Sequence, residues 1–255
     1  MKRNRIMWGV VSLGVLITLA ITFGTLDSHS QQKPQPTPTP DNKLIEERAR
    51  FPIVDYDAVE SGDLRERENR RSVNKKYDGE YLVPPNPHPD DGGSVVHDEL
   101  PKSPLFPVAE SDLIIFGSVV DSTAFISNDK KNVYTEFRVR AVEILKDDSK
   151  SLEAGALICT DRQGGFVRYP DGKKLIVENA RRKLLGKGES YILFLAKDKD
   201  TPNYRIITAF EISKNDFKEL NSGNKPAEFK ELDVDGFIAK IREEVARQID
   251  SRKDS

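Results

Sequence analysis

One stretch decides the fold of this chain: Asn132–Lys146, with the sequence Asn-Val-Tyr-Thr-Glu-Phe-Arg-Val-Arg-Ala-Val-Glu-Ile-Leu-Lys. Side chains alternate between the two faces of a β-strand, and one face here carries Val133, Thr135, Phe137 and Val139. After Ala141 the phase slips, and Val142 with Ile144 take the inward positions. A bulge near Arg140–Ala141 would keep the apolar side chains facing inward. Such a bulge lets a long strand curl around a small barrel, which the pattern therefore predicts.

Shorter apolar runs bounded by turn residues flank this strand at 113–116, 156–160, 165–169, 175–177, 190–196 and 204–210. Many short strands with little helix predict a mainly β fold, a small OB-like β-barrel, closed or partly open, over residues 109–212. A charged tail follows over residues 213–255. Within it, Asp233–Ile249 has the periodicity of an amphipathic helix, which we expect to pack on the barrel. A partner or a membrane surface is the alternative for its apolar stripe.

The N-terminus predicts a membrane anchor. Three cations within residues 1–5 precede an uncharged run over residues 6–26, and Asp27 follows it. The run would span ~30 Å as a helix, which matches the hydrocarbon core of a bilayer. The charge asymmetry predicts a single-pass transmembrane signal-anchor with residues 1–5 in the cytoplasm and the bulk of the chain outside it. A cleaved signal peptide is the alternative, and the protein would then be secreted.

Residues 27–108 read as a linker, largely irregular. Prolines alternate with other residues up to Pro40, so this part is expected to be an extended spacer. Densely mixed charges and further prolines follow, which favour short solvated helices and irregular chain. The single cysteine, Cys159, excludes a disulfide within the monomer. Because it lies in an apolar run, we expect its thiol to be buried.

Three stretches, Ser111–Val120, Phe137–Lys146 and Gly188–Lys197, occur in an order that resembles a known family. Together they resemble the strands of netrin-like modules, the OB-type barrel of tissue inhibitors of metalloproteinases. They also resemble uncharacterised bacterial exported proteins with the same barrel pattern. The resemblance covers residues 111–210 and implies a barrel. The inhibitors act through an N-terminal cysteine and a disulfide-bonded edge, which this chain lacks, so no functional residue of the family is carried over.

The sequence contains none of the H-E-x-x-H, G-x-S-x-G or G-x-x-x-x-G-K-[ST] motifs. Glu231–Gly236 is similar to the start of a calcium loop, but Arg242 occupies the position that needs a bidentate glutamate. The sequence therefore predicts no catalytic residue, no cofactor and no metal site. It favours a binding role over an enzymatic one.

One local patch of cations predicts a face for an anionic partner. It consists of Arg162, Arg168, Lys173, Lys174, Arg181, Arg182, Lys183 and Lys187. A solvated hairpin of mixed charge is the alternative. The location disfavours nucleic acid and leaves an envelope protein or an anionic polymer as partner. The functional prediction is a membrane-tethered extracytoplasmic binding or scaffold module of unknown ligand, the alternative being an exported hydrolase or a protease inhibitor with an unrecognised site.

Overall fold

A computed structural model describes residues 51–79, 82–85, 94–95, 105–178 and 183–253, all of which belong to the unit Pro40–Ser255. The predicted signal-anchor at residues 6–26 and the proline-rich spacer lie outside the described residues. Among the described residues, no helix has both the length and the apolar character that a membrane crossing requires.

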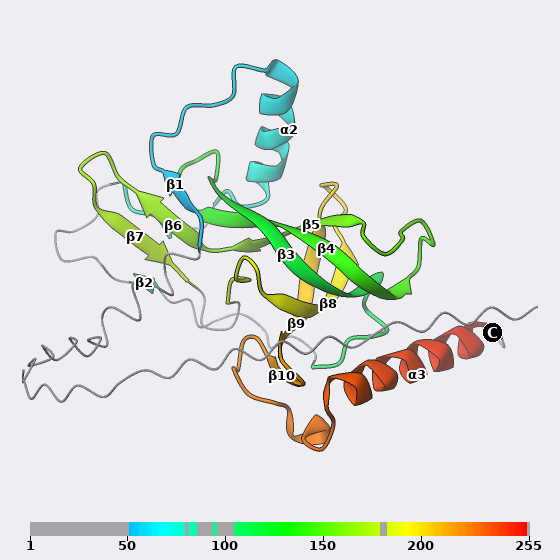
Figure 1. Cartoon of the computed structure of the whole chain (residues 1–255). Helices are drawn as coiled ribbons and strands as arrows, with labels where there is room; N and C mark the ends of the chain where they lie inside the picture. The colour runs from blue at the N-terminus through cyan, green and yellow to red at the C-terminus, as the bar shows by residue number, and fades with distance from the viewer. Residues whose placement is uncertain (1–50, 80–81, 86–93, 96–104, 179–182, 254–255) are drawn as a thin grey trace, which may run out of the picture. The chain divides into compact units, whose positions relative to one another are not determined.

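Five strands form a ring that is close to a barrel (Figure 1). The ring order is β3-β4-β5-β9-β8, and β8 pairs with β3 again. The contact between β5 and β9 is parallel and short, with only two residue pairs. A further strand, β10, extends the edge beside β9. The predicted mainly β architecture is therefore confirmed, with strands β3 (Leu113–Ile126), β4 (Val133–Asp147), β5 (Leu157–Gln163), β8 (Ser190–Lys197), β9 (Tyr204–Ser213) and β10 (Asp216–Glu219).

The long strand β4 follows the predicted alternation over its first half. Its four predicted inward residues are buried, and Ala141 continues the same face. The prediction that Val142 turns inward is wrong, because this side chain is 54% exposed. On the neighbouring strand, Gly117 pairs with Ala141 and Phe116 pairs with Glu143, so Val142 is the extra residue of a bulge. The bulge thus exists, but it lies after Ala141 and turns Val142 to solvent.

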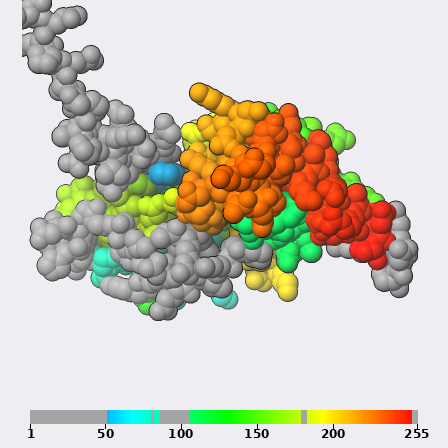
Figure 2. Space-filling model, turned by 90° about the horizontal axis from the view of Figure 1, so that it is seen from below, coloured from blue at the N-terminus to red at the C-terminus, as the bar shows by residue number. Residues whose placement is uncertain are grey.

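Two apolar clusters hold the ring together. One fills its interior, where Phe137 and Leu193 are fully buried. The other lies between the outer face of the ring and α3 (Val234–Lys253), centred on Phe237. Figure 2 shows the C-terminal residues, in orange and red, over this side of the molecule. The predicted docking of the C-terminal helix is confirmed, although Ile249 at the end of its stripe remains 50% exposed.

A second, small sheet is inserted between β5 and β8. Its centre is the hairpin of β6 (Gly165–Arg168) and β7 (Lys174–Val177). Two strands from the N-terminal segment extend this hairpin. β6 pairs in parallel with β1 (Ile53–Asp55), and β7 pairs in parallel with β2 (Ser94–Val95). The helix α2 (Leu64–Lys75) belongs to the same N-terminal segment and begins at Asp63, whose carboxylate caps it. Part of the predicted linker therefore carries ordered elements that contact the ring.

Candidate binding site

The outer face of β4 and β5 is covered by the residues that follow α2. On β5 the outward positions are Leu157, Cys159, Asp161 and Gln163, because Ile158 belongs to the interior cluster. Cys159 is exposed, whereas Asp161 is only 3% exposed although it lies two residues further along the same face. The prediction of a buried Cys159 is therefore wrong: Ile158 takes the inward position, and Cys159 shares the outward face with Leu157, which is 52% exposed.

Tyr77 covers this face through aromatic stacking. Its ring lies 4.2 Å from the ring of Tyr134, centroid to centroid, with an interplanar angle of 8°. The segment is also tied to the loop between β3 and β4. There, the amide of Asn128 donates to the carbonyl oxygen of Arg71 at 3.0 Å, and the N–H of Gly79 donates to Asp129 at 2.9 Å. These bonds fix the end of α2 over the sheet.

Asp161 is the centre of the polar contacts beneath this cover. Its carboxylate accepts hydrogen bonds from the Tyr77 hydroxyl, from Lys76 Nζ at 2.8 Å and from Asn203 Nδ2 at 3.1 Å. Lys76 also lies 2.5 Å from Asp198 Oδ2. Burial, together with the negative charge of Asp161, raises the pKa of the Tyr77 hydroxyl far above its ordinary value, so Tyr77 remains a donor at neutral pH.

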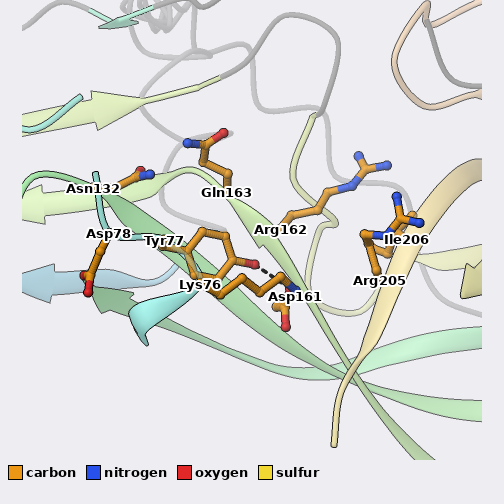
Figure 3. Close-up of a pocket in the computed structure, with 9 residues that line it drawn as sticks. All are labelled: Lys76, Tyr77, Asp78, Asn132, Asp161, Arg162, Gln163, Arg205 and Ile206. Atoms are coloured by element: carbon orange, nitrogen blue, oxygen red, sulfur yellow. Dashed lines mark hydrogen bonds and ion pairs between the residues drawn. The ribbon is translucent and has the colours of Figure 1, made fainter. Parts of the chain in front are cut away.

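A cavity of about 200 Å³ opens beside these contacts (Figure 3). Lys76 and Tyr77 point toward Asp161 at its centre, and Arg162 and Arg205 extend along one side. Asn132 lies on the other side. The walls therefore come from the segment after α2, from the start of β4, from β5 and from β9, and only the closed ring brings these four together.

Asn132 contributes a buried side-chain amide to the cavity wall. It is 1% exposed, and its Oδ1 accepts the N–H of Val133 at 2.8 Å, which fixes the orientation of the amide. Its Nδ2 donor has no hydrogen-bond partner among the described residues. A buried donor without an acceptor is costly, so this position favours an oxygen from a ligand or a water molecule.

Arg205 supplies the accessible charge of the cavity. The side chain is exposed and forms no ion pair with the described part of the chain. Lys76, in contrast, is neutralised by Asp161 and Asp198. Two carboxylates also line the cavity: Asp161 is paired with Lys76, and Asp78 accepts hydrogen bonds from the Asn128 amide and from the N–H of Asp129. The exposed guanidinium of Arg205 and the buried amide of Asn132 are the donors that a carboxylate or phosphate group could use.

The predicted cationic patch is distributed over several places. Arg162 lies in the cavity wall, is buried, and donates through Nη1 to the backbone oxygen of Lys183. Arg168 pairs with Lys174 in the β6–β7 hairpin, close to Lys173 at its turn. Lys187 lies elsewhere, beside Asp121. The structure therefore brings only part of the patch together.

Carboxylates accompany several of these cations. The Nε of Arg168 lies 2.5 Å from Asp55, and Lys173 Nζ lies 2.9 Å from Asp171. Lys187 Nζ lies 3.3 Å from Asp121. The two predicted residues that lie outside the described part of the chain are Arg181 and Arg182.

Sequence reasoning missed Lys76, Asn132 and Arg205. Lys76 lies in the predicted linker over residues 27–108. Asn132 directly precedes β4 and Arg205 lies near the start of β9, far apart in the sequence. None of the three forms a recognisable spacing with Arg162. In the described ranges, no group of three or more His, Cys, Asp or Glu residues is placed to hold a metal ion.

Comparison with known proteins adds no relative: no family model matches the sequence, and no curated protein or solved structure does.

Proposed function

We propose that this protein is a membrane-tethered extracytoplasmic binding module, whose OB-type, netrin-like barrel uses the cavity beside Asp161 to bind an anionic group of an envelope polymer. The cationic N-terminus and the uncharged run over residues 6–26 support the tether. The five-stranded ring supports an OB-type barrel, a fold that commonly binds polymers.

The observation that carries the proposal is the unpartnered amide of Asn132 in a cavity that also has Arg205 on its wall. Both groups are donors, and a carboxylate or phosphate offers several acceptor oxygens to them. Because Arg205 is exposed, it can meet the ligand first, and the buried amide then completes the binding of the group.

The volume of the cavity favours a single terminal or pendant group over a whole ligand. At about 200 Å³ it lies below the roughly 300–1,000 Å³ of pockets that enclose drug-sized molecules. A polymer that presents the same anionic group many times would gain affinity through repeated encounters with one such site.

The test is a binding titration of the full-length protein in detergent micelles. One arm uses a polymer with phosphodiester groups, a second arm uses a polymer of uronic acids, and a neutral polysaccharide serves as reference. We expect Arg205→Ala to weaken binding of the preferred polymer about tenfold, as for loss of a charge-assisted contact. The control is Arg140→Ala, which removes the same charge from an exposed position further along β4.

If the polymer binds in the cavity, we expect Arg140→Ala to bind the preferred polymer with the affinity of the unmodified protein. Equal losses for both variants would indicate general charge attraction and would contradict the proposed site. If neither anionic polymer binds better than the neutral polysaccharide, the proposed function itself is contradicted.

A further inference from the structure

We propose that the outer face of β4 and β5 is a docking surface for a basic helical segment of a partner protein, and that residues 63–79 of this chain occupy it in cis as an exchangeable clasp. This inference concerns the surface beneath the clasp and does not depend on the anionic ligand of the cavity. The clasp comprises the N-cap residue Asp63, α2 and the four residues that follow α2.

The clasp has a net positive charge, and the surface meets its cations with carboxylates. Residues 63–79 carry six cations and four carboxylates. Arg70 Nη1 lies 2.6 Å from Glu136 Oε1, and Lys76 lies 2.8 Å from Asp161 and 2.5 Å from Asp198. Charge complementarity of this kind selects partners and speeds their encounter, and it would serve any basic helix that presents cations at the same spacing.

The surface also offers aromatic anchoring positions. Tyr134 lies between Tyr77, at 4.2 Å, and Phe125, at 5.6 Å between ring centroids. The guanidinium of Arg70 lies 3.5 Å above the ring of Phe125. Tyrosine and arginine are the residue types that dominate binding energy at protein interfaces, so the clasp makes the contacts of a bound peptide.

The contact is separable from the cores of the ring. Val73 is the only buried residue of α2, and it joins Tyr77 and Tyr134 in a small cluster of their own. The clusters inside the ring and beneath α3 contain none of the residues of α2. A segment held by few apolar contacts and by polar side chains opens at lower free energy than the core strands. The clasp can therefore leave while the ring remains folded.

The first measurement is native-state hydrogen exchange of the full-length protein in detergent micelles. We expect the amides of α2 to exchange at least about tenfold faster than those of β3 and β8, through local opening. Equal protection of α2 and the central strands would show that the segment opens only with global unfolding, and would overturn the proposal.

The second measurement uses a labelled synthetic peptide of residues 63–79 as the probe. It is titrated into the unmodified protein and into the variant Lys76→Ala/Tyr77→Ala, which weakens the clasp. We expect the peptide to bind the variant about tenfold more tightly than the unmodified protein, because the cis segment no longer competes. The matched control peptide carries alanine at positions 70, 76 and 77.

Hydrogen exchange of β3 and β8 in the variant provides the check on folding. If these strands keep their protection and the variant does not bind the peptide, the docking surface is disproved. If the strands lose their protection, the segment is a part of the folded core and the exchangeable clasp is disproved. Equal binding of the control peptide would likewise contradict the proposal, since the contacts described above would not carry the affinity.

Discussion

At the scale of single residues, Gly117 shows how closely β3 and β4 approach each other. A Cβ at this position would lie 2.6 Å from the carbonyl oxygen of Arg140 and 2.9 Å from a methyl carbon of Val139. Neither can move far, because the oxygen belongs to the backbone and Val139 belongs to the interior cluster. Gly117 is therefore required by the space between the strands.

We predict that Gly117→Ala lowers the free energy of unfolding by about 1–3 kcal/mol, the usual cost of overpacking a core. Urea denaturation followed by circular dichroism measures it. Gly62→Ala is the control, because no atom lies within 4 Å of the added Cβ there. An unchanged midpoint for Gly117→Ala would show that the strands can separate without cost.

The buried hydroxyl of Tyr191 predicts how the stability of the fold changes at alkaline pH. Tyr191 is buried, and its hydroxyl oxygen accepts the N–H of Gly186 at 2.8 Å. Burial raises its pKa to about 12, although the N–H of Gly186 acts in the opposite direction. The folded state therefore favours the neutral hydroxyl, and this contribution is complete below the unfolded pKa of about 10.

The stability contributed by Tyr191 should consequently decline as the pH rises from about 10 toward 12. We predict that Tyr191→Phe unfolds with a shallower dependence on pH in this range, measured by urea midpoints at each pH. Identical slopes for the two proteins would contradict a raised pKa at Tyr191.

At the scale of elements, α3 packs on the ring through a buried apolar stripe that includes Phe237, Ile238 and Ile241. Phe237 is fully buried, and its ring lies 4.2 Å from the ring of Phe217 and 4.8 Å from the ring of Phe210. We predict that Phe237→Ala costs about 3–5 kcal/mol in the free energy of unfolding, as for other buried aromatic deletions. Ile249→Ala, at an exposed position of the same helix, should change it by less than about 0.5 kcal/mol. Similar effects of the two changes would contradict the docking described for α3.

The ion pair between Lys76 of the clasp and Asp198 predicts that the clasp is held less firmly in acid. Burial alone would raise the pKa of Asp198, but the hydrogen bond from Lys76 and those from the backbone outweigh it, and the pKa is lower than usual. A lowered carboxyl pKa stabilises the folded arrangement above the unfolded value of about 3.9, and the contribution is lost as the pH falls through the folded pKa.

Protection of α2 against hydrogen exchange, corrected for intrinsic rates, should therefore fall as the pH drops below about 4. Asp198→Asn should weaken this protection already at pH 7 and reduce its dependence on acid. Protection that is insensitive to both changes would show that the pair with Lys76 does not hold the clasp.

The elements differ in how far the sequence predicts them. The first half of β4 and the helix α3 were predictable, because their apolar periodicity is set by one buried face. The position of the bulge was not, since the pairing of Phe116 and Gly117 decides that Val142 is the extra residue. The outward phase of Cys159 was not predictable either, because the continuous apolar run Ala156–Ile158 before it does not alternate, although Leu157 faces outward and Ile158 inward.

The candidate site was even less accessible to sequence reasoning. Arg162 was predicted within the cationic patch, but its companions in the cavity, Lys76, Asn132 and Arg205, lie on separate elements. The closure of β5 onto β9 and the docking of the segment after α2 bring them together. Both are tertiary events between distant parts of the sequence, and neither leaves a local pattern.

At the scale of the whole molecule, the proposed arrangement is a barrel held outside the cytoplasm by an N-terminal anchor. Its most direct test uses the single cysteine of the chain. Cys159 is exposed, so a membrane-impermeant maleimide can reach it from the side on which the barrel lies. Partial burial raises the pKa of its thiol, so labelling should be carried out at mildly alkaline pH to increase the thiolate fraction.

The measurement is the labelling of Cys159 in spheroplasts that express the full chain, before and after lysis. A second protein, with Cys159→Ala and Asn4→Cys, reports the opposite side of the membrane. The proposed topology predicts that Cys159 is labelled fully before lysis and that the cysteine at position 4 is labelled only after it. Labelling of Cys159 only after lysis would place the barrel in the cytoplasm and contradict the tethered extracytoplasmic module.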